Sequence, residues 1–425
     1  MKTKRILRWG IVLFLLAALP GLTVALAQDE QPPAKQPLPP VTEPGESAAL
    51  PPTSSEYEPN NTLGTANNLG FNTGAISGKI DYPGDVDYFT FSINNSVNAL
   101  FDIDAVSMES WLDSVVCLLD ASGTELACND DADTLDSMVF SNIGYENSGW
   151  QDYYVRVTDY GNYHGGDNHF YELLGSNPLL VSATVNGTVA GVPFKSGDIL
   201  AHSDLWYDVQ KWVMFFDASD VGITKNLSNF DLDGSRNLLI GFAVNQPLPG
   251  LGTVTPWDIV RFTPTRYGPT TEGVFSWYEK GKDNGLTTTG EKIDAIIGDI
   301  GLHSYAWCYG HVISTTGTAK FGTQTYQDDD LLCGEGVGYG EFTNGAEVPG
   351  LAVEDVIAAD YEDNGDDELV YLTILGTGRV SGYPVNQKDI FAITYLYPSI
   401  WQRLVWHGPD WGWNFNIDAF DYDPE

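Results

Sequence analysis

The chain has 425 residues and a formal net charge of −38 at pH 7, with 58 acidic against 20 basic residues. Such a surface repels phosphate groups, which excludes nucleic acid and anionic lipid as expected partners. The acidity has two interpretations: it keeps the protein soluble, or it binds divalent cations, which prefer carboxylate and carbonyl oxygens.

The first 27 residues have the pattern of a secretory signal peptide. Basic residues up to Arg8 precede an apolar run from Trp9 to Val24, and Ala25-Leu26-Ala27 offers the small residues that signal peptidase accepts. An uncleaved membrane anchor is the alternative, although the run is short for a span. We therefore expect residues 1–27 to be removed and the protein to be secreted, extracellular or at the cell surface, without a membrane span. Residues 28–54 are rich in Pro, Gln and Glu and predict a disordered linker.

Residues 55–176 alternate short apolar segments with clusters of Gly, Asn and Asp, which predicts a jelly-roll-like β-sandwich. Cys117 and Cys128 flank a predicted hairpin in this region. Cross-strand positions of a hairpin come within bridging distance, which favours a disulfide between these two and a second between Cys308 and Cys333. Four cysteines allow three connectivities, and the sequence leaves the choice open.

A series of short motifs runs through the same region in a fixed order. They are Glu58-Pro59-Asn60-Asn61-Thr62, Gly84-Asp85-Val86-Asp87-Tyr88-Phe89, a turn after Leu118, Asn129-Asp130-Asp131 and Tyr153-Tyr154-Val155-Arg156-Val157. Over about residues 55–174 this order resembles bacterial pre-peptidase C-terminal (PPC) domains. The resemblance implies a secreted β-sandwich, calcium binding and an accessory, non-catalytic role. Domains of this type are often appended to peptidases, and no peptidase precedes the region in this sequence.

Calcium is the cofactor that the residues favour. Asp85 and Asp87 lie two apart at the start of a predicted strand, so their side chains share one side of the backbone. Because Ca²⁺ takes six to eight oxygen ligands, further residues would have to complete the shell if their loop folds back on this strand. The candidates are Asp113, Asn129, Asp130, Asp131 and Asp136. The alternative is that these residues only shape turns.

Residues 177–425 contain a fourfold repeat. The clearest copy is Lys211–Ile223 (KWVMFFDASDVGI), an aromatic strand that ends in an acidic, glycine-containing turn. Related segments start near Gly273, Glu341 and Ile400, and each is preceded by an Asp and apolar residues and followed by a short strand. Four strands in each of four units predict an antiparallel β-repeat domain, as a small β-propeller. An open β-array or two packed sandwiches are the alternatives.

Trp401, Trp406, Trp411 and Trp413 crowd the last unit. If exposed, these rings would stack on sugars, whereas packing in the core is the alternative. The sequence lacks a His-Glu-x-x-His motif, a Gly-x-Ser-x-Gly motif and a phosphate-binding glycine loop. We expect a calcium-binding, non-catalytic adhesion or binding protein of the bacterial surface or matrix, with a polysaccharide or protein ligand. The alternative is a secreted hydrolase (glycoside hydrolase, lyase or peptidase-associated protein) with its site on the repeat domain.

Overall fold

The computed structural model of the chain describes residues 54–425 with short gaps, at 95, 131–134, 145–148, 206–208, 234–236, 299–307, 309, 322, 335–338, 349, 352–353, 364–367, 381–382, 397–398 and 423–425. The predicted signal peptide, nearly all of the predicted linker and Asp131 lie outside the described residues. Where the chain is described, its regular elements are β-strands and short 3-10 helices, so the protein is all-β, as predicted. In this part of the chain no helix is long and apolar enough to cross a membrane.

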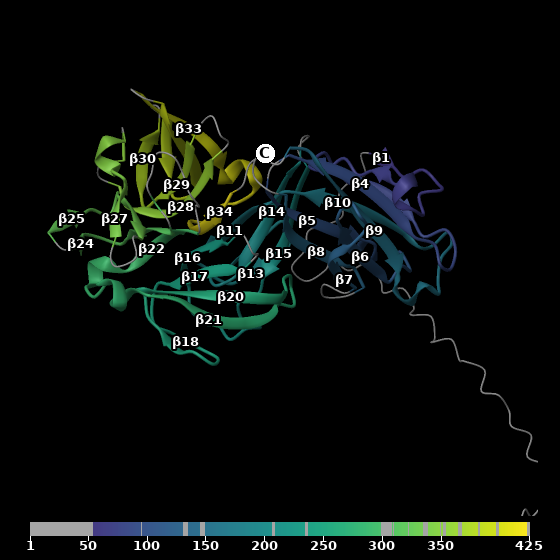
Figure 1. Ribbon diagram of the computed structural model, residues 1–425, viewed down its shortest axis with the longest axis horizontal. Coiled ribbons are helices and arrows are strands. Elements are labelled where there is room, and N and C mark those ends of the chain that lie inside the picture. The colour runs from purple at the N-terminus through teal and green to yellow at the C-terminus, as the bar shows by residue number, and fades with distance from the viewer. Residues whose placement is uncertain are drawn as a thin grey trace, which may run out of the picture. The chain divides into compact units, whose positions relative to one another are not determined.

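The strands up to Ser176 form two five-stranded sheets (Figure 1). The first has the order β1 (Ser54–Ser55), β3 (Ile76–Lys79), β10 (Phe170–Ser176), β5 (Val97–Asp104) and β8 (Met138–Ile143). The second has the order β2 (Asn67–Asn68), β4 (Asp87–Ile93), β9 (Gln151–Asp159), β6 (Ser114–Leu119) and β7 (Glu125–Asn129). Without the short β1 and β2, the two orders are those of a jelly roll, in agreement with the predicted sandwich.

The two sheets enclose one apolar core. Phe89 and Phe91 alternate with more exposed residues along β4 and pack on Phe101 of β5, with the rings of Phe91 and Phe101 5.2 Å apart. Strand β5 is buried at every position, whereas a strand with one face in solvent would alternate between buried and exposed residues. Its second face is covered by the repeat region, because Leu100 belongs to a cluster that also contains Phe215.

The strands after Ser176 form four four-stranded antiparallel sheets and four small hairpins. The four sheets are β34 (Ile417–Asp421), β11 (Leu179–Ala183), β14 (Ile199–Leu205), β15 (Val209–Phe216); β16 (Leu227–Leu232), β17 (Leu238–Phe242), β20 (Asp258–Arg266), β21 (Glu272–Lys280); β22 (Ile293–Ile297), β23 (Val312–Thr315), β26 (Leu331–Gly334), β27 (Tyr339–Thr343); and β28 (Val356–Asp363), β29 (Glu368–Ile374), β32 (Asp389–Leu396), β33 (Ser399–His407). The hairpins are β12 (Gly187–Val189) with β13 (Val192–Phe194), β18 (Gln246–Leu248) with β19 (Gly252–Val254), β24 (Ala319–Phe321) with β25 (Gln324–Tyr326), and β30 (Thr377–Val380) with β31 (Tyr383–Asn386).

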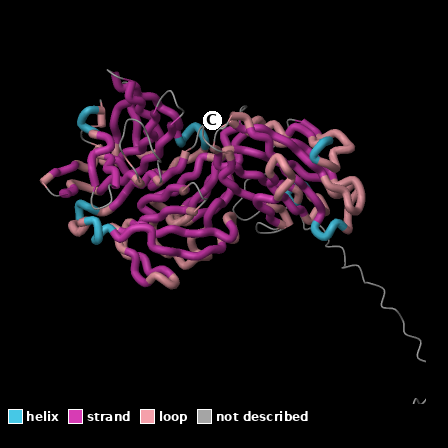
Figure 2. Tube along the Cα trace, in the orientation of Figure 1, coloured by secondary structure: helices cyan, strands magenta, loops and turns pink. Residues whose placement is uncertain are grey.

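Short 3-10 helices lie in the connections between strands (Figure 2). They are η1 (Leu63–Thr65), η2 (Val106–Met108), η3 (Tyr160–Asn162), η4 (Gly281–Asn284), η5 (Thr289–Glu291), η6 (Gly345–Glu347) and η7 (Gly408–Trp411). Three of them, η4, η6 and η7, occupy the acidic turns of the repeat that the sequence predicts.

The repeat units differ from the predicted ones in where they begin. The short strand after each acidic turn is the first strand of the next sheet, and β34, near the C-terminus, completes the first sheet by pairing with β11. The four first strands contact one another in cyclic order, from β34 to β16, β22, β28 and back to β34. This order is consistent with the expected β-propeller, which stays a prediction.

One aspartate in each repeat ties a strand to its turns. Asp198, Asp258, Asp330 and Asp389 each accept the backbone N–H of the residue three positions earlier, at 2.7 to 2.9 Å. The second oxygen accepts the N–H of Ala218, Gly281 or Gly345 in the first three repeats, and contacts His407 Nδ1 at 2.6 Å in the fourth. Because both oxygens are used by the fold, the repeated aspartate is explained by structure alone.

Both disulfides have the expected pairing. Cys117 and Cys128 are cross-strand partners on β6 and β7, and Cys308 is bonded to Cys333 on β26. Structural disulfides are typical of proteins in oxidising compartments.

Candidate metal centre

Five carboxylates gather at one end of the sandwich, from two segments of the chain. Oxygens of Glu56, Glu58 and Asp87 lie within 4.8 Å of one another, and so do oxygens of Glu58, Asp81 and Asp85. Glu58 is common to both groups, so the five acids form one continuous cluster. We refer to it as the sandwich cluster.

Backbone pairing brings the two segments together. Strand β1 pairs in parallel with β3, and Glu56 N donates to Ser77 O at 2.9 Å. On the other sheet, Tyr88 N donates to Asn60 O at 3.1 Å. Residues 56–60 are therefore held beside the connection from β3 to β4, which carries the other acids.

Two buried oxygens in this cluster have no hydrogen-bond donor among the described residues. They are Asp87 Oδ1 and Asn60 Oδ1, and both residues are completely buried. The other oxygen of Asp87 accepts from the Tyr171 hydroxyl at 2.6 Å, and the Asn60 amide donates to Glu56 Oε2 at 3.1 Å. These bonds fix both side chains. A buried acceptor without a donor costs about 1–3 kcal/mol, and a bound cation would remove this cost.

Among the described residues, the buried side of the cluster, formed by Glu56 and Asp87, has no ion pair with a basic side chain. Burial, followed by the charge of Glu56, raises the pKa of Asp87 to about 9. Burial likewise raises the pKa of Glu56 to about 7, although the Lys79 N–H and Asn60 bind its charged form. The Lys79 ammonium pairs instead with Asp81, at 2.6 Å, on the more exposed side of the cluster.

The predicted metal ligands divide into two groups. Asp85 and Asp87 belong to the sandwich cluster. In the described part of the chain, Asp113, Asp130 and Asp136 do not come together with two further His, Cys, Asp or Glu side chains. The Asp136 carboxylate accepts the N–H groups of Ala105 and Val106 at 3.1 Å, and the Asn129 amide donates to Met138 O at 2.8 Å. Metal binding by these four residues, and by Asp131 outside the described residues, stays a prediction.

Sequence reasoning missed Glu56, Glu58, Asn60 and Asp81. A signal for two of them was present, because Glu58 and Asn60 stand in the first of the ordered motifs and Asp85 and Asp87 in the second. The contact between these motifs follows from sheet pairing, which the local pattern does not specify.

Two of the four candidate ligand-binding tryptophans are core residues, which corrects that hypothesis for them. Trp413 is fully buried and stacks on Trp212 and Phe194, with ring centroids 5.3 and 5.5 Å away. Trp406 is 4% exposed in the same cluster. Trp411 is partly buried, 5.4 Å from the ring of His202, and the side chain of Trp401 is outside the described part of the structure.

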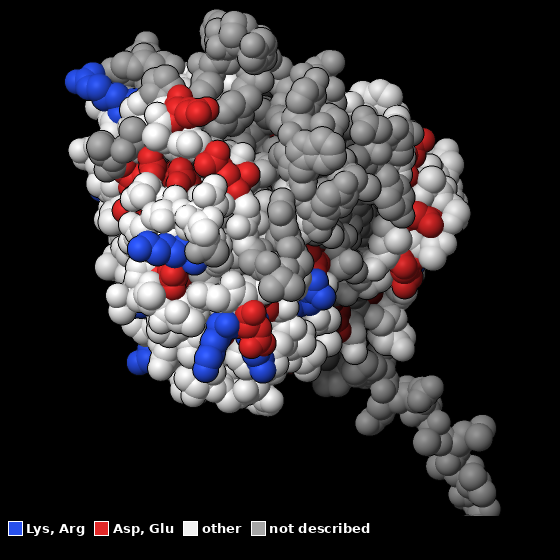
Figure 3. Space-filling model, turned by 60° about the vertical axis from the view of Figure 1, so that its left-hand side comes forward, with Lys and Arg blue, Asp and Glu red and all other residues white. Residues whose placement is uncertain are grey.

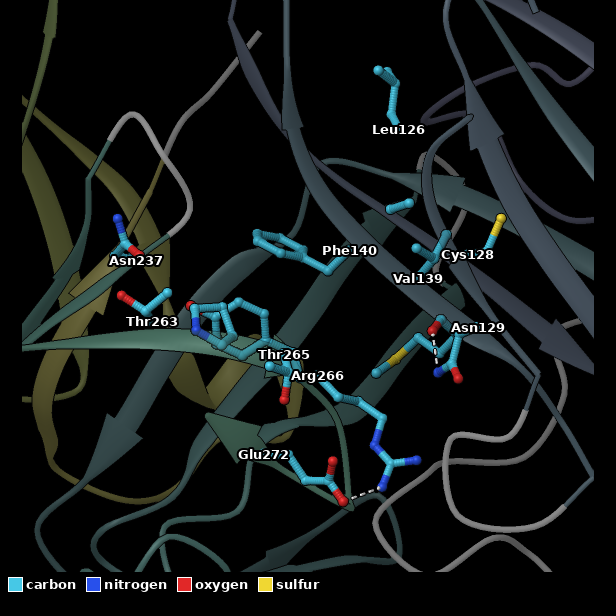
Figure 4. A pocket seen from close by; sticks show the side chains of 14 residues that line it. Leu126, Cys128, Asn129, Val139, Phe140, Asn237, Thr263, Thr265, Arg266 and Glu272 are labelled. Atoms are coloured by element: carbon cyan, nitrogen blue, oxygen red, sulfur yellow. Dashed lines mark hydrogen bonds and ion pairs between the residues drawn. The ribbon is translucent and has the colours of Figure 1, made fainter. Parts of the chain in front are cut away.

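A cavity of ≈ 540 Å³ lies between the sandwich and the repeat region (Figure 4). Residues of β7 and β8 line one side, and Thr263, Arg266 and Glu272 line the other. Arg266 pairs with Glu272 at 3.1 Å. Among the described residues, Glu272 supplies the one carboxyl group of the lining, whereas glycoside hydrolysis generally requires two.

The surface carries charges of both signs. On the face shown in Figure 3, acidic side chains gather in a band, whereas the basic side chains lie apart from one another.

No family model matches the chain. It is similar to a probable subtilase-type serine protease of Deinococcus radiodurans, with 39% identity over 88 residues. The matched segment is 20% of this chain and 12% of that protein, so the chain spans about an eighth of the relative.

Proposed function

We propose that the protein is a secreted, calcium-binding, non-catalytic adhesion or binding protein whose sandwich is a PPC-type domain. The sandwich cluster is its calcium site, with Asp87 Oδ1 and Asn60 Oδ1 as buried ligands. Carboxylates of Glu58 and Asp85 would supply further oxygens, and water would complete the six to eight that Ca²⁺ takes.

The observation that carries this proposal is the pair of buried oxygens without donors inside a group of acids. Turn-forming acids normally use their oxygens on backbone N–H groups, as Asp136 does on Ala105 and Val106. Asp87 Oδ1 and Asn60 Oδ1 have no such partner in the described structure. A bound cation would interact favourably with both oxygens in place of the missing hydrogen-bond donors.

Calcium would stabilise the sandwich by joining two of its segments. Residues 56–60 are joined to the sheets by few backbone bonds, and the acids of the two segments repel each other when ionised. A bound ion would attract the acids of both segments, so their repulsion would be replaced by attraction. It would thereby hold residues 56–60 against the β3–β4 connection. Calcium therefore stabilises the folded state by mass action, because the unfolded chain has no preformed site.

Exposed aromatic residues support a role in ligand binding. Tyr57 is 82% exposed and Tyr82 is 53% exposed, and both lie next to acids of the cluster in sequence. The Tyr82 hydroxyl accepts from Asn61 at 2.9 Å, so its ring is held at the edge of the cluster. Exposed rings beside a metal site favour contact with sugars or with side chains of a partner protein.

Calcium titration calorimetry, together with melting curves in calcium and in chelator, tests the proposal. In the Asp87→Asn variant we expect calcium affinity to fall and the melting temperature in chelator to rise, because one buried acid is removed. Asp152→Asn is the matched control, since Asp152 is an exposed residue of β9 bonded to Ser92. Equal calcium binding by wild type and Asp87→Asn would refute the site.

The hydrolase alternative rests on the similarity to the Deinococcus protein, whose name describes a protease. Assays of the purified chain on casein and on polysaccharides separate the two functions. A binding protein retains a ligand without turnover, whereas an enzyme releases product.

A further inference from the structure

The first strands of the four repeat sheets share a β-bulge at the same position. The pairing register shifts between Leu227 and Asn229 on β16, and between Ile293 and Ala295 on β22. The same shift occurs on β28 and on β34. The bulged residues are Ser228, Asp294, Ile357 and Asp418.

At one of these bulges an acid meets an amide. Asp418 of β34 accepts a hydrogen bond from the side chain of Asn226, which immediately precedes the neighbouring β16. Burial raises the pKa of Asp418 to about 7, and the bond from Asn226 opposes this rise. The Asp418 carboxylate therefore has a side-chain donor within the protein, although Asn226 Oδ1 is itself buried without a partner among the described residues.

At the corresponding place between β22 and β28, an acid meets another acid. The bulged residue is Asp294, and Asp355 immediately precedes β28, the position that Asn226 holds before β16. The Asp355 carboxyl lies beside Asp294, and the charge of Asp328 acts on both. The backbone of Asp328 is fixed to this strand, because its carbonyl accepts the N–H of Val356 at 3.0 Å.

The Asp294 side chain is buried, and the Asp355 carboxyl is its one side-chain partner in the described part of the chain. Its exposure is 5%, and no side-chain amide, hydroxyl or ammonium group of the described residues donates to either of its oxygens or to Asp355 Oδ1. Two ionised carboxylates at this place would therefore have no donor between them. Burial and the charge of Asp355 hold the pKa of Asp294 well above its ordinary range, and burial raises that of Asp355 to about 6.

We propose that a divalent cation, with Ca²⁺ as the best match to carboxylate ligands, binds between Asp294 and Asp355 and joins β22 to β28. The ion takes the place of the amide that pairs with Asp418 in the related position. Two carboxylates supply part of its shell, and water completes it. The site is separate from the sandwich cluster and does not depend on the function proposed for that cluster.

The test is to count calcium ions bound per chain by equilibrium dialysis and elemental analysis of the full chain. The key variant is Asp355→Asn, which recreates the Asp–Asn pair seen at Asp418 and Asn226. We expect it to bind one ion fewer than wild type and to melt at a higher temperature than wild type in chelator. Asp418→Asn, on a bulge that already has its partner, is expected to bind the wild-type number of ions.

Two outcomes would overturn the inference. One is an equal number of bound ions in wild type and Asp355→Asn. The other is a wild-type chain that binds no ion here and whose stability depends on pH in a way that Asp355→Asn removes, because Asp294 and Asp355 then share a proton. Asp87→Asn, measured alongside, removes an ion from the sandwich cluster only, so failure of either site is recognised independently.

Discussion

The ammonium group of Lys211 lies 2.8 Å from Asp104 Oδ2, and both side chains are buried. Lys211 belongs to β15 of the repeat region and Asp104 to β5 of the sandwich, with Asp102 as a second partner at 3.1 Å. Together with the packing of Leu100 against the repeat region, the contact accounts for the burial of the second face of β5. One face of the strand packs in the sandwich core, and the other presents two carboxylates to one lysine.

Replacing Lys211 by methionine is expected to destabilise the protein by about 3–5 kcal/mol, because Asp102 and Asp104 stay buried without their cation. Urea unfolding monitored by circular dichroism measures the change. The control is Lys195→Met, an exposed lysine bonded to Ser219, for which we expect a change within about 0.5 kcal/mol. Equal stability of the two variants would show that the buried pair is not important for folding.

Calcium binding at the sandwich cluster is expected to release protons. Without calcium the pKa of Asp87 is raised to about 9 and that of Glu56 to about 7, so at neutral pH the site holds protons that the ion must displace. Affinity should therefore increase as pH rises from 6 to 9. Calorimetry in buffers of different ionisation enthalpy measures the protons released, and a pH-independent affinity would contradict the assignment.

The stability of the repeat region is expected to depend on pH through Asp418. Its pKa is about 7 in the folded state, against about 4 in the unfolded chain, so the folded state binds more protons in between. The contribution is complete below about pH 4 and is lost as pH rises towards 7. Asp418→Asn should flatten the stability profile in this window when unfolding is measured at several pH values in chelator. A profile that stays as steep as that of Asp152→Asn would assign the dependence to other groups.

Trp413→Ala is expected to cost about 3–5 kcal/mol, the usual range for a buried aromatic truncated to alanine. The ring is fully buried between Phe194 and Trp212, so the loss is one of packing. Chemical denaturation of the variant gives the value. If Trp413→Ala instead kept its stability and lost binding to a glycan array, the ring would have to be a ligand contact.

The parts of the fold that could be predicted are those with local signals. Alternating apolar residues and Gly or Asn turns specify strands and hairpins, and the Cys117–Cys128 bridge follows from one hairpin. The sequence pattern places the short strand after each acidic turn in the same unit as that turn, whereas in the structure it belongs to the next sheet. The partner of a short strand after a turn is not specified locally. Strand β34 pairs with the edge strand β11, which lies more than 200 residues earlier in the chain.

Only the residues that one segment contributes to the candidate metal centre could be predicted, for a related reason. Asp85 and Asp87 lie together in sequence, so their shared direction follows from the strand period. Glu56, Glu58 and Asn60 join them because two strands of two residues each, β1 and β2, pair in parallel with β3 and β4. Strands this short leave almost no trace in the pattern of apolar residues.

The pairing of β34 with β11 also affects the order in which contacts can form while the chain is synthesised. The sheet that follows the sandwich lacks its first strand until residues 417–421 have emerged, whereas the second and third sheets use strands that are close in sequence. Asn98 of the sandwich also depends on this strand for a hydrogen bond, because its side-chain amide donates to Asp421 at 3.0 Å. The contacts that the sandwich and its neighbouring sheet make with β34 can therefore form only after residues 417–421 have been synthesised.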